Sequence, residues 1–328
     1  MKNKLLKLLL LSSMPLASLL SACNGNQKIV GILQPVQHPA LEAARKGFEA
    51  GIKDNISGVK IEYRNAGGND ADLNAYAKDL VDISALTLGI GTGASLALKG
   101  AEDNAGYQKP LLFTAVTDPV DAGLVDNKDN KTGFACGTTD ANPVEEQIAL
   151  IKEFNASADK VGIIYTQTEV NSKVQADQAQ AAIEAAGMSA LVRTCNNSSD
   201  IKATALAIAD TEGMDAIYVP TDNNIAANMN AIKEATSGKN ILIVCGEEGM
   251  LKGGGHVTLS IDYFNLGYST GKMAAQILKG EKKTTDFPVV PVPASDCAYA
   301  FSSTNLAANS LTMPEAMRTG HEWKDVNA

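Results

Sequence analysis

The stretch "LFTAVTDPVDAGL", residues Leu112 to Leu124, joins a strand-like run to a polar cluster. An apolar run typical of a buried strand stops at a hydroxyl, an acid and a proline: Thr117, Asp118 and Pro119. Polar residues at the end of a strand serve as helix caps, as catalytic groups or as ligand contacts. The surrounding sequence helps to decide which of the three roles applies here.

Short apolar runs alternate with helical patterns along the chain. The strand-like runs of the first half are "KIVGIL", "VKIEYR", "LTLGIG" and "KPLLFTAV", and those of the second half are "KVGIIYT", "SALVRTC", "DAIYVPT" and "NILIVCG". Continuous apolar strands that are followed by helices favour parallel sheets covered on both faces. Two such series predict an α/β fold with two doubly wound, Rossmann-like lobes and a ligand cleft between them.

The order of these segments predicts how the chain divides between the lobes. We expect the N-terminal lobe to comprise residues 28–142 and 261–288, and the C-terminal lobe to comprise residues 143–260 and 289–328. The turn residues of "GTTDANP" place the first boundary near Asp140–Pro143. We expect "HVTLSIDYF" to form a strand, and the helix that follows it to stop at Gly280. This strand and this helix, which follow the second lobe, are candidates to return to the first.

The N-terminal residues have the composition of a secretory signal, because Lys2, Lys4 and Lys7 precede an apolar run and small residues. The segment Leu20–Cys23 resembles the lipobox of bacterial lipoproteins, in which the chain is cut before a cysteine that then carries the lipid. We therefore expect a signal peptide over 1–22, lipid attachment at Cys23 and a polar tether over 23–27. This anchor would hold the protein at the cell membrane, on the extracytoplasmic face. The alternative is an ordinary signal in which the cysteine is incidental.

Charge and cysteine usage exclude several function classes. The formal net charge is −9, and it becomes −12 without the three lysines of residues 1–22, so we expect no nucleic acid partner. The cysteines besides Cys23 show no C-x-x-C or paired Cys/His spacing, so we expect no metal site, and nothing indicates a cofactor. The favoured state of Cys136, Cys195, Cys245 and Cys297 is a buried free thiol. A disulfide between two of them is the alternative.

Enzyme motifs are weak in this sequence. No G-x-S-x-G, H-E-x-x-H or P-loop is present, and "GIGTGAS" (Gly89–Ser95) matches a dinucleotide-binding loop only in part. We therefore expect no enzyme. A surface enzyme that uses paired cysteines or aspartates in proton transfer is the alternative from a different class.

Polar residues gather where the predicted strands stop. Ligands of open α/β sheets bind beyond the carboxyl ends of the strands, so we expect these residues to face one cleft. The candidate ligand-binding residues are Gln34, His38, Thr92, Ser95, Thr117, Asp118, Thr166, Asn171, Ser172, Thr221, Asp222, Asn223, Glu247 and Asp262. For a single residue, a helix cap explains the pattern equally well. As a set, "YTQTEVNS" and "VPTDNN" hold more polar residues than a cap needs, which favours ligand binding.

Five blocks of the sequence resemble substrate-binding proteins of ABC transporters: "VGILQPVQHPALEAARKGFEAG", "PLLFTAVTDPVDAGLV", "VGIIYTQTEVNSKVQ", "AIYVPTDNNIA" and "SIDYFNLGYSTGKMAAQILKGE". The resemblance covers nearly the whole mature chain. It is to a lipoprotein group with the type I periplasmic-binding-protein fold, some of whose members bind aromatic amino acids. It implies three crossovers between the lobes, with hinges expected near Asp140, Ile261 and Pro291, and no catalysis. The chain departs from the family pattern at Gln37 and at 166–168, two places that bear on ligand identity.

These patterns favour a monomeric, lipid-anchored binding protein that closes its lobes on a small amino acid-like ligand, including aromatic ones, for an ABC permease. Acids could pair with the ligand's ammonium and hydroxyls could donate to its carboxylate: the candidates are Asp118, Asp222 and Glu247 for the first role and Thr92, Ser95 and Ser172 for the second. A sugar or a nucleoside is an alternative ligand. Sugar sites usually stack the sugar ring on aromatic side chains. A sugar is therefore disfavoured here, because the aromatic content is only 5% and the sole tryptophan, Trp323, is expected in a C-terminal tail. A surface sensor or adhesin with the same cleft is a further alternative.

Overall fold

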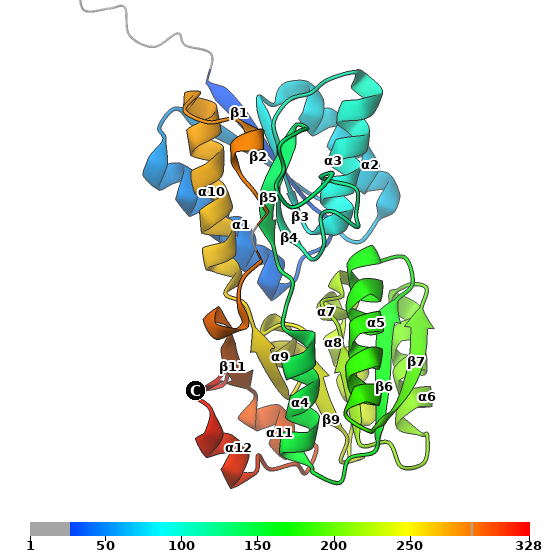
Figure 1. The fold of residues 1–328 in the computed structure, drawn as a ribbon. Coiled ribbons are helices and arrows are strands. Elements are labelled where there is room, and N and C mark those ends of the chain that lie inside the picture. The colour runs from blue at the N-terminus through cyan, green and yellow to red at the C-terminus, as the bar shows by residue number, and fades with distance from the viewer. Residues whose placement is uncertain (1–26, 290) are drawn as a thin grey trace, which may run out of the picture.

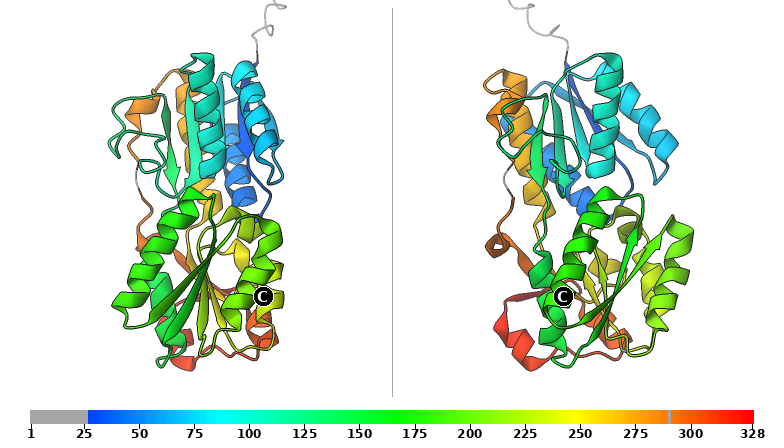
Figure 2. Two further views of the ribbon diagram at one scale, coloured as in Figure 1. Left: turned by 90° about the vertical axis from the view of Figure 1, so that its right-hand side faces the viewer. Right: turned by 45° about the vertical axis from the view of Figure 1, so that its right-hand side comes forward.

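The computed structural model describes residues 27–289 and 291–328. The chain forms two α/β lobes that stand end to end, as Figure 1 and both views of Figure 2 show. Each lobe has its own sheet, and no strand is shared between the two sheets in the described chain. This arrangement confirms the predicted α/β class with two doubly wound lobes.

The first lobe is built on a five-stranded parallel sheet with the order β2-β1-β3-β4-β5. Its strands are β1 (Lys28–Gln34), β2 (Val59–Asn65), β3 (Leu86–Ile90), β4 (Leu111–Val116) and β5 (Ala135–Thr139). The strands β3 and β4 are buried at every residue, whereas the edge strand β2 is partly exposed. The continuous apolar runs of the sequence therefore mark strands that are covered on both faces.

Helices cover both faces of this sheet. They are α1 (Pro39–Asn55), α2 (Asp70–Ile83), α3 (Thr92–Ala105) and α10 (Tyr263–Lys279). One apolar core joins α1 and α10 to the sheet, and a second core joins α2 and α3 to the opposite face. The helix α10 comes from late in the sequence, and it lies against α1, as expected for a helix that returns to the first lobe (Figure 1).

The backbones of α1 and α10 touch because glycines face one another across the contact. A Cβ atom added at Gly267 would lie 1.9 Å from the carbonyl oxygen of Ala44, and one added at Gly47 would lie 2.0 Å from that of Phe264. No larger residue fits at these positions without moving a helix. The close contact fixes α10, and with it the chain segment that leads into α10, against the first lobe.

The second lobe has a seven-stranded sheet with the order β12-β11-β10-β9-β8-β6-β7. Its strands are β6 (Lys160–Thr166), β7 (Ser189–Cys195), β8 (Ala216–Val219), β9 (Leu242–Cys245), β10 (Val257–Ser260), β11 (Ala298–Phe301) and β12 (Trp323–Asp325). Neighbouring strands are parallel except for β11, which runs antiparallel to β10. Its helices are α4 (Val144–Phe154), α5 (Val170–Ala185), α6 (Ile201–Ala209), α7 (Asn223–Ala227), α8 (Met229–Thr236), α9 (Gly249–Gly253), α11 (Ser303–Ala308) and α12 (Glu315–Gly320).

The chain crosses between the lobes after β5, after β10, and between the 3₁₀ turn Thr284–Asp286 and β11. Asp140 lies in the first of these crossings and Ile261 in the second, and Pro291 lies in the third. All three expected hinge positions are thus found in segments that connect the two sheets.

The structure corrects two expectations about local structure. "HVTLSIDYF" is not one strand, because β10 ends at Ser260 and Asp262 caps α10 by accepting a hydrogen bond of 3.1 Å from the Asn265 amide. The strand β10 also stays in the sheet of the second lobe, so only the helix returns to the first. Trp323 does not lie in a tail either. It belongs to β12, where its ring packs at 5.2 Å from the ring of Tyr299 in the neighbouring strand.

Two further expectations concern the thiols and the N-terminus. Cys136, Cys195 and Cys245 are buried free thiols and Cys297 is a half-buried one, and none of these four forms a disulfide. The predicted signal peptide and the lipid attachment at Cys23 lie outside the described residues. Among the residues that are described, no helix has both the length and the apolar character needed to cross a bilayer.

Candidate functional site

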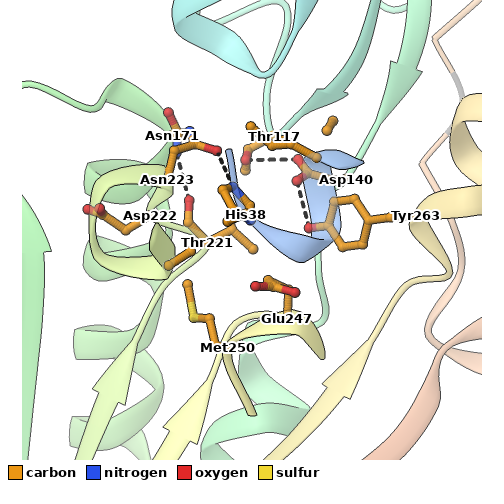
Figure 3. Close-up of a pocket in the computed structure, with 13 residues that line it drawn as sticks. His38, Thr117, Asp140, Asn171, Thr221, Asp222, Asn223, Glu247, Met250 and Tyr263 are labelled. Atoms are coloured by element: carbon orange, nitrogen blue, oxygen red, sulfur yellow. Dashed lines mark hydrogen bonds between the residues drawn. The ribbon is translucent and has the colours of Figure 1, made fainter. Parts of the chain in front are cut away.

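The cleft between the lobes encloses a small space that we call the inner cavity. The first lobe contributes His38, Leu41, Ala115, Thr117, Asp140 and Tyr263, and the second contributes Asn171, Thr221, Asp222, Asn223, Ala226, Glu247 and Met250 (Figure 3). Most of these residues follow the carboxyl end of a strand, where open α/β sheets bind ligands. The volume of the inner cavity is about 10 Å³, which is room for about one water molecule.

A larger space, which we call the outer cavity, lies next to the inner one and shares Asn171 and Asn223 with it. Its apolar wall consists of Pro35, Val36, Leu73, Leu96 and Val170, and its polar lining includes Asn69, Thr92, Thr166, Thr168, Glu169 and Asn197. Both lobes contribute to it. Its volume of about 320 Å³ falls within the range of small-molecule sites, about 300–1,000 Å³.

Asp140, in the first crossing, is the centre of a network that joins three segments. Its carboxylate accepts hydrogen bonds from the Thr117 hydroxyl at 3.0 Å and from the Tyr263 hydroxyl at 2.8 Å. The Tyr263 hydroxyl in turn accepts from the side-chain amide of Asn142 at 3.2 Å. Burial raises the pKa of Asp140, and its hydrogen bonds oppose that rise. This network connects the end of β4 to both hinge segments that border the cleft.

Asp222 caps the helix α7 and is bound by protein donors on both carboxylate oxygens. Oδ1 accepts from the Ile225 amide at 2.8 Å and from the Thr166 hydroxyl at 2.9 Å, and Oδ2 accepts from the Thr166 amide at 2.6 Å. Burial raises the pKa of Asp222, and these bonds to the charged form oppose the rise. The residue therefore ties the end of β6 to the start of α7.

Glu169 also binds the start of α7, although the sequence patterns did not single it out. Its carboxylate accepts from the amides of Asn223 at 2.9 Å and Asn224 at 2.7 Å, and from the side-chain amides of Asn223 at 2.8 Å and Asn171 at 3.2 Å. Unpaired N–H groups and a partial positive charge make a helix N-terminus a good place for a carboxylate. Burial and the nearby Asp222 carboxylate raise the pKa of Glu169.

Glu247 differs from the other acids of the cleft. Its side chain is buried, and the residue is only 2% exposed. The Gly249 amide donates to Oε2, whereas Oε1 has no hydrogen-bond partner among the described residues. Burial raises the pKa of Glu247 to about 7.

His38 connects the two lobes. Its Nε2 lies 3.1 Å from Oδ1 of Asn223, whose side-chain amide donates to Glu169. Because Oδ1 is an acceptor, Nε2 of His38 carries the proton and donates. Burial lowers the pKa of His38 to about 4, so the ring is neutral near pH 7. Its Nδ1 is therefore an acceptor, and it has no partner in the part of the chain that the structure describes.

The structure brings together many of the residues predicted from the sequence. The inner cavity is lined by His38, Thr117, Asn171, Thr221, Asp222, Asn223 and Glu247, and the outer cavity by Thr92 and Thr166 in addition. In the inner cavity, the lining residues that the sequence patterns did not select are Leu41, Ala115, Ala226, Met250 and Tyr263, and Asp140 was selected only as a hinge. In the outer cavity, the unselected residues include Glu169. Most of the unselected residues of the inner cavity are apolar, so they look like ordinary core residues in the sequence. Glu169 could have been selected from the sequence, since it lies inside the polar cluster "YTQTEVNS".

The remaining predicted residues line neither cavity, because each binds nearby groups. Gln34 donates to the Val36 carbonyl and to Glu42, and the Ser95 hydroxyl donates to the Gly91 carbonyl. Ser172 is buried beside Asn171, and Asp262 is an exposed cap of α10. Asp118 was expected in the cleft with Thr117, but its Oδ1 accepts from the amides of Val120 at 3.0 Å and Asp121 at 2.9 Å in a tight turn outside it.

Residues 29–317 match the family of ABC transporter substrate binding proteins. The chain belongs to this family. It is 34% identical to a tyrosine-binding protein of Clostridioides difficile (strain R20291) over 270 residues, which is 80% of this chain and 76% of the relative. The family binds substrates for ABC transporters, so this chain is a binding protein and not an enzyme, as the sequence predicted.

Two solved structures are similar at the same sequence identity, 29%. One is an ABC domain from Streptococcus pneumoniae in complex with L-Trp. The structural match covers 90% of this chain and 99% of that one, with a TM-score of 0.83. The other is a ligand-free, open substrate-binding protein with adhesive properties from Clostridium difficile, which covers 91% and 99% with a TM-score of 0.66.

The two TM-scores indicate how the lobes are arranged in this chain. The present structure resembles the L-Trp complex more than the open, ligand-free protein, although both are equally identical in sequence. A hydrogen bond between the lobes, from His38 to Asn223, and the small inner cavity agree with this. The lobes are therefore closed on the cleft.

Within the described residues, no group of three or more His, Cys, Asp or Glu side chains is placed to hold a metal ion. The carboxyl groups are instead bound by hydroxyl and amide donors, an arrangement that suits an organic ligand with its own hydrogen-bonding groups.

Proposed function

We propose that this substrate-binding protein captures an amino acid with an aromatic side chain and presents it, as a monomer, to an ABC permease. One observation carries the proposal. The carboxyl groups of Asp140, Glu169, Asp222 and Glu247 gather around the two cavities, and no lysine or arginine is among the described residues that line them. A site with this charge favours a ligand that carries a cation, such as the ammonium group of an amino acid.

The outer cavity offers a partner for the ligand's carboxylate. The helix α3 begins at Thr92 without a side-chain cap and without an acid in its first turn, so its first N–H groups lack side-chain acceptors. Thr92 and Gly93 line the cavity, and the Thr92 hydroxyl has no hydrogen-bond partner within residues 27–289 and 291–328. The helix N-terminus also carries a partial positive charge. These features support a carboxylate in the outer cavity.

The apolar wall of the outer cavity and the names of the relatives support an aromatic side chain. Leu73, Leu96 and Val170 present apolar surface there, and Val170 is 43% exposed in the structure. One relative is named a tyrosine-binding protein, and one similar structure contains L-Trp. Burial of an aromatic ring against such a wall removes a large apolar area from water.

The test is titration calorimetry of the purified protein with L-Tyr, L-Trp and L-Phe. Tyramine lacks the carboxylate and 3-(4-hydroxyphenyl)propionate lacks the ammonium group, so each should bind at least tenfold more weakly than L-Tyr. A buried hydrogen bond to a charged group contributes about 1.5–3 kcal/mol, which corresponds to this factor or more. Glucose and adenosine represent the alternative ligand classes. Binding of either one, with no heat from any amino acid, would overturn the proposal.

We further propose that Cys23 carries a lipid that holds the protein at the membrane surface. In cells, the Cys23→Ala variant should leave the membrane fraction, and mass spectrometry should find acyl chains only on the unchanged protein. An unchanged membrane fraction would argue against this anchor.

A surface sensor or adhesin is the second candidate, because one similar structure is a binding protein with adhesive properties. Uptake of labelled ligand by cells that lack the protein separates the two functions. A receptor of an importer is required for uptake at low ligand concentration, whereas a sensor or adhesin is not.

A further inference from the structure

The unpaired polar atoms of the inner cavity indicate what it binds. Among the described residues that line it, the buried side-chain atoms without a hydrogen-bond partner are Nδ1 of His38 and Oε1 of Glu247. His38 and Glu247 are 6% and 2% exposed, so bulk water does not supply the missing hydrogen bonds. A buried polar group without a partner costs about 1–3 kcal/mol, and a ligand that satisfies it recovers this cost.

Both unpaired atoms are acceptors. The Nε2 atom of His38 donates to Asn223, which leaves Nδ1 with a lone pair, and Oε1 of Glu247 belongs to a carboxyl group. The group that complements them is therefore a hydrogen-bond donor, and beside a carboxylate it is preferably a cation.

The other acids of the cleft already have donors. Asp222 accepts hydrogen bonds from Thr166 and from the start of α7, Asp140 accepts from two hydroxyls, and Glu169 accepts from four amide groups. Of these four acids, Glu247 alone keeps a carboxyl oxygen without a partner among the residues that the structure describes. The four acids are thus distinguishable by their hydrogen bonds, although all of them lie at strand ends.

We infer that Glu247 is the charge partner of the ligand's ammonium group, with Nδ1 of His38 as a second acceptor. This inference rests on the proposed function, and it assigns one residue of the site to one group of the ligand. The inner cavity has room for about one water-sized group, which matches an ammonium group, and the outer cavity next to it takes the rest of the molecule.

This role makes binding depend on pH. The groups that face Glu247 are Asp140 in the first crossing, Tyr263 on α10, Cys245 on β9 and its neighbour Glu248. Burial and the negative charges of Asp140 and Glu248 favour the neutral acid and raise the pKa of Glu247 to about 7, whereas an ammonium group favours the carboxylate. The dissociation constant for L-Tyr should therefore rise about tenfold between pH 8 and pH 6.

The experiment compares Glu247→Gln with Glu248→Gln by calorimetry with L-Tyr at pH 8. Glu248 is a matched control, since it is the adjacent glutamate but does not line the cavity, and its carboxylate pairs with Lys324 at 2.7 Å. We expect the first variant to bind at least thirtyfold more weakly and to lose the pH dependence, and the second to stay within threefold of the unchanged protein. The compound 3-(4-hydroxyphenyl)propionate should bind both variants with similar affinity.

Each outcome decides one question. If the unchanged protein binds L-Tyr and Glu247→Gln binds it equally well at both pH values, the inference is wrong while the proposed function stands. If the unchanged protein binds no amino acid, the proposed function itself fails. Thermal unfolding of each variant without ligand shows whether it is folded, so a loss of binding is not confused with a loss of structure.

Discussion

His38 at the start of α1 donates a hydrogen bond of 3.1 Å to Asn223 at the start of α7, and this bond joins the two lobes across the cleft. Asn223 is held in place by Glu169, which accepts from both its backbone and its side-chain amide. The contact therefore depends on closure, because opening of the cleft separates the two helix starts.

We expect the His38→Phe variant to populate the open form more than the unchanged protein does. The variant keeps a ring but loses the donor, and a neutral hydrogen bond contributes about 0.5–1.5 kcal/mol net, or roughly a two- to tenfold change in the equilibrium. Small-angle scattering of the empty protein should show a larger radius of gyration. His321→Phe is the control, since His321 pairs with Glu153 on the surface of the second lobe. Equal radii for both variants would contradict a role for His38 in closure.

Asp222 has a structural role that the sequence alone could not separate from ligand binding. Its carboxylate accepts from Ile225, as a helix cap does, and from Thr166 twice. We expect Asp222→Ala to lower the free energy of unfolding by about 2–4 kcal/mol, because it removes the cap and leaves the donors of Thr166 unpaired. Denaturant unfolding of the empty protein measures this. A loss below 1 kcal/mol would mean that other groups replace the carboxylate and would reopen its assignment as a ligand contact.

The pattern of strands and helices could be predicted because it follows from local sequence, but the orientation of each polar residue could not. Thr117 and Asp118 follow the same strand, yet only Thr117 lines the cavity, since Asp118 turns back to the amides of Val120 and Asp121. That difference depends on the path of the backbone after β4. A sequence pattern gives the end of the strand and not this path.

Other parts of the site could not be predicted because they come from distant segments. Tyr263 begins a helix that packs on the first lobe, and its hydroxyl binds Asp140, more than a hundred residues earlier in the chain. Met250 and Leu41 look like core residues in the sequence, since nothing local distinguishes an apolar cleft wall from an apolar core. Only the fold as a whole brings them to the inner cavity.

The contact between α1 and α10 should tolerate no side chain. We expect Gly267→Ala to lower the free energy of unfolding by about 2–3 kcal/mol, because its Cβ would lie 1.9 Å from the Ala44 carbonyl oxygen. Gly100→Ala is the matched control in α3, where an added Cβ meets nothing within 4 Å, and it should stabilise the helix by about 0.5–1 kcal/mol. Denaturant unfolding compares the two. Equal effects would show that α10 can move away from α1 at little cost.

Glu247 also affects the stability of the empty protein. The pKa of Glu247 rises from 4.5 in an unfolded chain to about 7 in the folded protein. The folded state therefore keeps this proton longer, so the stabilisation is complete below pH 4.5 and is lost as pH rises through about 7. Replacement by glutamine, which stays neutral, avoids the loss. We expect Glu247→Gln to be more stable than the unchanged protein at pH 8, by up to about 3 kcal/mol, and similar to it near pH 4.5.

Comparing the variant with the unchanged protein separates the effect of Glu247 on stability from that of the histidines. His38 and His256 have pKa values that burial lowers to about 4, so they remove stability as pH falls below 6.5, the opposite direction. Both are present in the two proteins, and their contribution cancels in the comparison. Thermal unfolding between pH 4.5 and pH 8 provides the measurement. Parallel curves for the two proteins would mean that Glu247 titrates like an exposed acid, whereas curves that diverge with rising pH would show that the empty protein keeps, at a cost in stability, a buried carboxylate for its ligand.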